Sequence, residues 1–146
     1  MTSEEKEQII IDIAKNIYKI EDENNLALLL SIHRLESDNG NSRRCVEDNN
    51  PGGLKEGNNF LKFKTFEIGA ESFVRNVQKI INRTNSLENY DSNISFESNM
   101  QTIYCPGESD WGIKVESIKN SILKNKELDI YINENIEKNK VFIYKK

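Results

Sequence analysis

One carboxylate in the sequence has the spacing expected of a general acid. Glu36 lies four residues after Ile32 and seven after Leu29, so a helix places it on the same face as apolar residues. Burial disfavours the charged form of a carboxyl group, raises its pKa and keeps it protonated near neutral pH. Such a group can donate a proton to a leaving oxygen. The alternative is an ordinary surface glutamate at a fraying helix end, and spacing alone does not decide between the two.

Few other residues offer chemistry. The two cysteines, Cys45 and Cys105, are either two free thiols or one disulfide between loops, and a disulfide would favour an oxidising compartment. Their separation excludes a CxxC metal pair, and the single histidine, His33, leaves little for a zinc site. These residues therefore give little support for a metal site. His33 lies one turn before Glu36, where it either lines a cleft or has a structural role.

The helix that carries Glu36 is expected from about Asn24 to Ser37. Its first half is apolar nearly all round, which is typical of a buried helix; the apolar residues are Leu26, Ala27, Leu28, Leu29, Leu30 and Ile32. The sequence Asp-Asn-Gly at positions 38–40 is a strong stop signal. Glu36 is therefore expected where a polar loop begins and where a cleft can open onto it.

Four further helices are expected from apolar periodicity. They cover about Ser3 to Ile20, Glu67 to Asn82, Phe96 to Ile103 and Asp110 to Lys124. Ser3 and Ser109 are the expected caps of the first and the last of these. Residues 128–146 fit either a short helix or an edge strand.

A turn-rich stretch from Asn39 to Asn59 follows the Glu36 helix. Its centre, Asn49-Asn50-Pro51-Gly52-Gly53, combines locally bonding Asn side chains, a fixed proline φ and glycines that accept positive φ. Together with the alternation from Leu61 to Phe66, it predicts a small β-hairpin around residues 56–59. The turn either presents backbone amides to a ligand or is simply structural, and both can hold.

Three segments, in this order, resemble a known family. Residues 35–42 (LESDNGNS) and 49–55 (NNPGGLK) resemble the core signature of bacterial autolysin-type endo-β-N-acetylglucosaminidase domains. Residues 63–70 (FKTFEIGA) resemble the aromatic strand of that family and the helix after it. Tyr104-Cys105-Pro106, with Trp111 and Val115, resembles its Tyr-x-Pro…Trp…Val segment. The match runs from about residue 26 to 123, but Cys105 stands where many members have a small residue, and residues 43–48 match no family pattern.

The resemblance implies a mainly α, lysozyme-like fold with a small β-hairpin lobe, as one domain over residues 1–146. It also implies hydrolysis of β-1,4 glycosidic bonds in peptidoglycan glycan strands. Because such cleavage needs only positioned carboxyl groups and a water, we expect no metal and no organic cofactor. By position, Glu36 matches the catalytic glutamate, and Tyr104 matches a tyrosine that borders the scissile bond; the alternative for Tyr104 is a core tyrosine. The other residues expected to bind substrate are Ser42, Asn50, Gly52 and Gly53.

A two-carboxylate hydrolase needs a second carboxyl group about 5–9.5 Å from the acid. The candidates are Asp38, Glu47, Asp48, Glu56 and Glu67. We favour Glu56 as the second catalytic residue, because the tip of the β lobe can come down over a bound sugar. Two routes that use one glutamate remain open: closure of a 1,6-anhydro ring, as in lytic transglycosylases, and attack by the N-acetyl group of the substrate.

Composition narrows the remaining function classes. The 146 residues carry a net charge of −4 with no visible basic patch, which argues against nucleic-acid binding, although the acidity is unfavourable beside anionic wall polymers. The longest apolar run, Leu26 to Leu30, is far shorter than the ~20 residues of a membrane span. We expect a monomer that acts outside the cell or at the cell wall. The start of the sequence does not resemble a signal peptide, so export would need a longer chain or a phage-type lysis system.

Three functions remain in competition. The first is an endo-acting enzyme that cuts after N-acetylglucosamine. The second is a muramidase or lytic transglycosylase that cuts after N-acetylmuramic acid. The third is a non-catalytic domain that binds glycan or a protein partner, and it would be favoured if the acid were missing.

Overall fold

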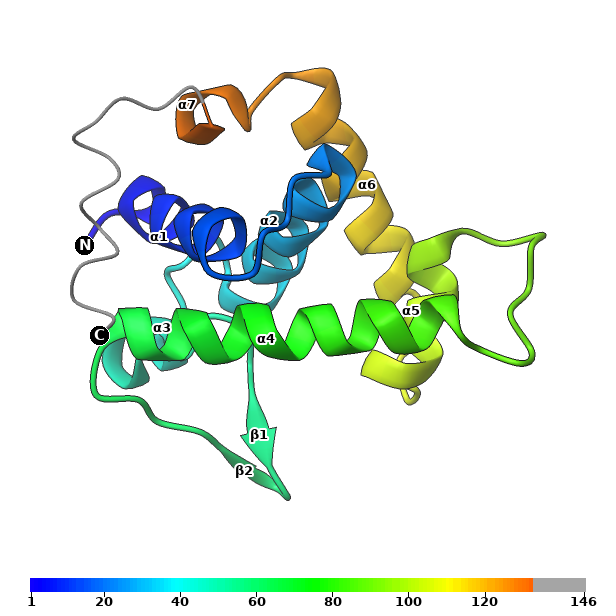
Figure 1. The fold of residues 1–146 in the computed structure, drawn as a ribbon. Coiled ribbons are helices and arrows are strands. Elements are labelled where there is room, and N and C mark those ends of the chain that lie inside the picture. The colour runs from blue at the N-terminus through cyan, green and yellow to red at the C-terminus, as the bar shows by residue number, and fades with distance from the viewer. Residues whose placement is uncertain (133–146) are drawn as a thin grey trace.

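A computed structural model describes residues 1–132, which form helices and one two-stranded hairpin (Figure 1). This confirms the prediction of a mainly α fold with a small β-hairpin. The helices are α1 (Ser3–Asn16), α2 (Glu23–Ser37), α3 (Arg43–Asp48), α4 (Phe66–Asn85), α5 (Phe96–Tyr104), α6 (Trp111–Lys124) and α7 (Asp129–Ile132). The strands are β1 (Lys55–Glu56) and β2 (Asn59–Phe60). Of the ambiguous segment 128–146, α7 is helical, and residues 133–146 lie outside the described range.

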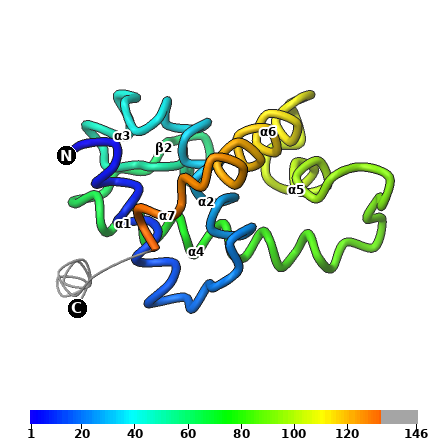
Figure 2. Tube along the Cα trace, turned by 90° about the horizontal axis from the view of Figure 1, so that it is seen from above, coloured from blue at the N-terminus to red at the C-terminus, as the bar shows by residue number. Residues whose placement is uncertain are grey.

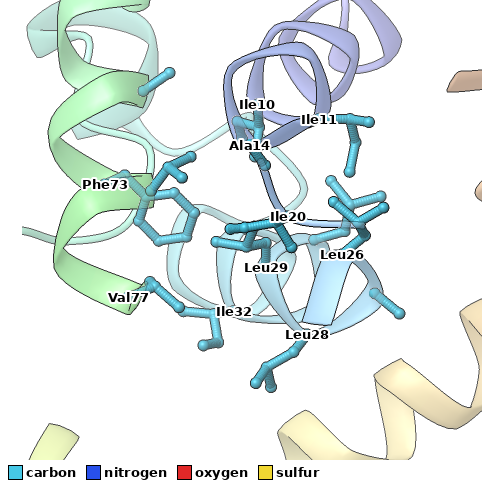
Figure 3. Close-up of a cluster of buried hydrophobic side chains, with 14 of the residues drawn as sticks. Ile10, Ile11, Ala14, Ile20, Leu26, Leu28, Leu29, Ile32, Phe73 and Val77 are labelled. Carbon is cyan, nitrogen blue, oxygen red and sulfur yellow. The ribbon is translucent and has the colours of Figure 1, made fainter. Parts of the chain in front are cut away.

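Helix α2 lies at the centre of the helical body and packs against α1 and α6. Helix α4 packs across α1 and reaches α5, which in turn lies beside α6 (Figure 2). In the core, Phe73 and Val77 of α4 point toward the apolar faces of α1 and α2 (Figure 3). Fully burying each such side chain contributes about 1.5–3 kcal/mol, so this contact fixes α2, and with it Glu36, relative to α4.

Several helix ends lie one to four residues from their predicted positions. Thr2, not Ser3, caps α1, and its hydroxyl and the Glu5 side chain form a reciprocal capping box. Asp110, not Ser109, precedes α6, and α6 has no side-chain cap. Helix α1 ends at Asn16, four residues earlier than expected.

The sequence did not predict helix α3, which lies within the stretch from Asn39 to Asn59 that was interpreted as turn-rich. The helix has only six residues and one buried side chain, Cys45, so apolar periodicity could not reveal it. The hydroxyl of Ser42 caps it by accepting a hydrogen bond from the Cys45 backbone N–H at 3.2 Å. Helix α3 therefore fills the space between the end of α2 and the glycine-rich turn.

The hairpin is confirmed in place but is shorter than the alternating sequence suggested. Lys55 pairs with Phe60 and Glu56 with Asn59 in antiparallel register. Gly57 takes a positive φ of 62° in the turn between the strands. The hairpin projects from the helical body beside α4 (Figure 1). Leu61–Thr65 continue as an irregular segment, and Phe66 already begins α4.

Candidate functional site

An open cleft of about 580 Å³ lies between the hairpin and α4. Five parts of the chain line it, and they come together only in the folded protein. These are Glu36 from α2, residues 52–55 of the glycine turn, Phe60 and Leu61, one face of α4, and the segment that includes Tyr104, Cys105 and Glu108. The α4 face carries Ser72, Arg75, Asn76, Lys79 and Ile80.

Glu36 is half-buried on the wall of this cleft. Burial is the largest influence on its carboxyl group and raises its pKa, as the sequence predicted. A hydrogen bond from the indole N–H of Trp111, 3.0 Å from Oε2, acts in the opposite direction, and the nearby charge of Glu108 raises the pKa further. The net effect is a raised pKa for a carboxyl group that lines the cleft.

The two oxygens of Glu36 have different environments. The indole N–H of Trp111 can only donate, so Oε2 must accept. Oε1 lies against the turn, since a Cβ built on Gly53 would stand 3.2 Å from it. A proton on the carboxyl group is therefore best placed on Oε1, with Trp111 fixing the plane of the group.

The glycine turn fits tightly between the acid and the core. A Cβ on Gly52 would lie 2.3 Å from the Phe73 ring of α4, a distance at which a larger residue must displace that ring. Gly53 has a positive φ of 65°, which side chains other than glycine rarely adopt. Both residues line the cleft, as expected for a turn that presents its backbone to a ligand.

Asn50 holds this turn from behind. Its side chain is 1% exposed, and its Nδ2 donates to the carbonyl oxygens of Leu54 and Leu61 at 2.9 and 3.0 Å. Its Oδ1 accepts from the backbone N–H of Leu54 at 2.9 Å. Of the two roles considered for this turn, ligand binding and structural support, the Asn50 side chain has the structural one. It does not line the cleft.

His33 supports the same turn. It is fully buried, its Nδ1 lies 2.7 Å from the carbonyl oxygen of Pro51, and it packs edge-on against Phe66 and Phe73. Burial lowers its pKa, so the neutral ring donates its Nδ1–H to Pro51. Of the two interpretations of His33, the structure favours the structural one.

Two aromatic rings, Tyr104 and the buried Trp111, pack together beside Glu36. Their rings stack with centroids 4.7 Å apart and an interplanar angle of 18°. The Tyr104 hydroxyl donates a long hydrogen bond of 3.4 Å to the Gly52 carbonyl oxygen. Tyr104 also lines the cleft. Burial and the charge of Glu36 raise its pKa, which keeps the phenol neutral. Tyr104 therefore borders the acid, where the sequence placed it.

The structure does not bring Glu56 into the cleft. Glu56 is exposed on β1 and is not among the lining residues. The second carboxyl group that lines the cleft belongs to Glu108, in the turn between α5 and α6, whose backbone N–H donates to the Cys105 carbonyl oxygen at 3.0 Å. Sequence reasoning missed Glu108 because only tertiary packing brings this turn to the end of α2.

The other predicted residues lie away from the cleft or serve the fold. Ser42 caps α3 and does not line the cleft. Asp38, another candidate for the second carboxylate, ends α2 in a left-handed conformation with a φ of 52°. Cys45 and Cys105 are free thiols, so the disulfide is not formed. Cys105 lines the cleft, and burial with the nearby carboxylates raises its pKa to about 12.

The chain was compared with known proteins in three ways. A scan against protein-family models, a search of curated proteins and a search of solved structures found no match. Within residues 1–132, no cluster of His, Cys, Asp and Glu is suited to hold a metal ion, and no helix is long and apolar enough to cross a bilayer. The functional argument therefore rests on the geometry of the cleft and on the resemblance of its motifs.

Proposed function

We propose that this protein is a glycoside hydrolase that cleaves β-1,4 bonds of peptidoglycan glycan strands, with Glu36 as the general acid. The observation that carries the proposal is the state of Glu36: a half-buried carboxyl group with a raised pKa, oriented by Trp111 and open to a cleft. The motifs around it resemble autolysin-type endo-β-N-acetylglucosaminidase domains, which supports the substrate class. Cleavage after N-acetylglucosamine is the leading assignment.

The cleft suits a chain of sugars. Protonated Oε1 of Glu36 donates its proton to the glycosidic oxygen as the bond to the anomeric carbon breaks. Phe60 and Tyr104 contribute aromatic carbon to the lining of the cleft, and Ser72 and Asn76 offer hydrogen-bonding groups. The backbone of Gly52 and Gly53 lies close to the acid because neither residue has a side chain.

Glu36 is half-buried in the cleft and is oriented by Trp111, so we assign the acid role to it. Glu108 lies on an exposed turn and influences Glu36 through its charge. This arrangement favours a route in which Glu36 serves first as acid and then as base, or in which the substrate supplies its own nucleophile. A lytic transglycosylase or muramidase that uses Glu36 alone is therefore the second candidate.

A non-catalytic glycan- or protein-binding domain is the alternative from another class. A binding cleft has no need of a half-buried carboxyl group held by a single N–H donor, so the environment of Glu36 favours catalysis. In this proposal the protein acts as a monomer outside the cell or at the cell wall, and peptidoglycan strands are its partner.

The first test is Glu36→Gln, which keeps the shape of the side chain and its bond from Trp111 but removes the proton. We expect the rate of peptidoglycan cleavage to fall by about 10²–10⁴-fold, the usual contribution of a general acid, with an unchanged thermal unfolding midpoint. Glu56→Gln is the matched control, because Glu56 is exposed and outside the cleft. A Glu36→Gln protein that clears walls at near-normal rate would overturn the assignment.

Mass spectrometry of the digested glycan separates the three functions. A new reducing end at N-acetylglucosamine supports the leading assignment. A reducing end at N-acetylmuramic acid supports a muramidase, and a 1,6-anhydro product supports the transglycosylase. The absence of any soluble product from the wild-type protein supports the binding domain.

A further inference from the structure

A second hollow adjoins the cleft on the other side of the hairpin. It has a volume of about 510 Å³ and lies between α3 and the hairpin. Its lining includes Arg44 and Asp48 from α3, Asn58 and Asn59 from the hairpin, and Lys62. Phe60 lines both this hollow and the cleft, so the two depressions meet at one aromatic ring. A polymer bound in the cleft can therefore place a substituent in the second hollow.

Positive charge gathers around that ring. The guanidinium carbon of Arg44 lies 3.5 Å from the Phe60 ring centroid, and Nζ of Lys55 lies 4.6 Å from it. This contact fixes the side chain of Arg44 without neutralising its charge. The Phe60 ring thus holds cations at the boundary between the two hollows.

Most of these cations have no anionic partner in the described part of the chain. Within residues 1–132, Arg44, Lys55 and Lys62 form no ion pair, and neither does Lys79 on the α4 wall of the cleft. The neighbouring Arg43 also lines the second hollow, but it is paired with Glu47 at 3.5 Å. Among the lining residues of this hollow, Asp48 supplies the one carboxylate.

This concentration of charge contrasts with the whole molecule, which has a net charge of −4. Unpaired cations in a hollow raise the local concentration of anionic ligands and bind carboxylate oxygens by charge-assisted hydrogen bonds. Asn58 and Asn59 add amide donors and acceptors of the kind that pair with peptide groups. The combination suits a short acidic peptide better than a neutral sugar.

We propose that the hollow between α3 and the hairpin binds the carboxylate-bearing peptide substituents of the glycan strand held in the cleft. The preferred substrate is then peptide-bearing glycan, and strands without peptides bind more weakly. This inference rests on the proposed function, because it takes the cleft as the site of the glycan strand. Arg44 and Lys62 bind the peptide carboxylates and do not take part in bond cleavage.

The experiment measures binding without turnover, in a Glu36→Gln background. The probes are soluble peptidoglycan strands with their peptides and the same strands after enzymatic removal of the peptides. We expect the peptide-bearing strands to bind about tenfold more tightly, roughly the effect of one charge-assisted hydrogen bond. Arg44→Gln combined with Lys62→Gln should remove this preference, and raised salt should weaken it.

Lys64→Gln is the matched control, since Lys64 is an exposed cation that lines neither hollow. Lys62→Gln alone provides a second variant that leaves the Arg44–Phe60 contact intact. Equal binding of both probes, or a preference that survives the double substitution, overturns the inference. Tighter binding of a phosphate-rich wall polymer than of peptide-bearing strands also overturns it.

A parallel cleavage assay with the wild-type protein keeps the two proposals separate. If both strand types are cleaved equally and the charge variants change nothing, only the peptide-binding inference fails. If neither strand type is cleaved but the charge-dependent preference in binding persists, the hydrolase proposal fails. The inference that the hollow binds acidic peptides is then still supported.

Discussion

Two carboxyl groups on opposite sides of α2 show that pairing, together with burial, determines what a carboxyl group can do. Glu7 of α1 is only 4% exposed. Its oxygens accept hydrogen bonds from Arg34 at 2.8 and 3.0 Å and from the Tyr131 hydroxyl at 2.8 Å. Arg34 is also paired with Glu127 at 2.9 Å. Glu7 is therefore paired with a cation, and the cluster of Glu7, Arg34, Glu127 and Tyr131 joins α1, α2 and α7.

Glu36 is more exposed than Glu7, and no cation in the described part of the chain pairs with it. Among residues 1–132 it has one N–H donor, Trp111, and it lies near the like charge of Glu108. A bidentate arginine forms strong charge-assisted hydrogen bonds with a carboxylate and stabilises the fold. A half-buried carboxyl group without a cationic partner has a raised pKa, as Glu36 has. The same helix thus carries a structural ion pair on one side and a proton donor on the other.

Breaking the Glu7 cluster should have the largest effect on stability. Arg34→Met keeps much of the side-chain volume but leaves Glu7 buried without a counterion. Removing one partner of a buried pair costs about 3–5 kcal/mol, and we expect a loss of this size in the free energy of unfolding. Urea titration at pH 7, followed by far-UV circular dichroism, measures it.

Arg75→Met is the matched control for that experiment. Arg75 also pairs with a glutamate, Glu71, at 3.2 Å, but its side chain is 56% exposed. Exposed pairs of this kind contribute less than about 1 kcal/mol. The comparison between the two sides of α2 fails if Arg34→Met costs no more than Arg75→Met.

Trp111→Phe should have the next largest effect, on the acid itself. Phenylalanine retains an aromatic ring beside Tyr104 but loses the N–H that lowers the pKa of Glu36. Since the acid must be protonated, activity falls as pH rises through that pKa. A higher pKa therefore moves the alkaline limb of the rate profile to higher pH.

The same substitution also frees the plane of the carboxyl group. We expect the maximal rate of Trp111→Phe to fall about tenfold, because an unoriented acid reaches its geometry less often. Initial rates on peptidoglycan across pH measure both effects together. An unchanged alkaline limb would show that the indole does not control the protonation of Glu36.

The sequence was sufficient for what depends on local spacing. Helical periodicity placed Glu36 on the buried face of α2, and the structure confirms the direction of its pKa shift. The Asn-Asn-Pro-Gly-Gly segment correctly predicted a turn before a hairpin. These features follow from residues within a few positions of one another.

The sequence was insufficient where partners come from distant segments. Arg34 was not singled out, because its partner Glu7 lies on another helix. Glu108 was missed, and Glu56 was favoured in its place, because only the packing of α6 on α2 brings the α5–α6 turn to the acid. No spacing rule gives the distance between two such segments.

Glu108→Gln should produce the smallest effect and is the finest test of the comparison. The charge of Glu108 is the least of the three influences on the pKa of Glu36, after burial and the Trp111 bond. Removing this charge lowers the pKa of Glu36, so the alkaline limb of the rate profile should move to lower pH. The maximal rate at acidic pH should stay close to that of the wild type.

Glu56→Gln, which removes a carboxylate outside the cleft, should leave the whole profile unchanged. A loss of about 100-fold at every pH would instead make Glu108 a second catalytic carboxylate, and Glu36 would no longer act alone.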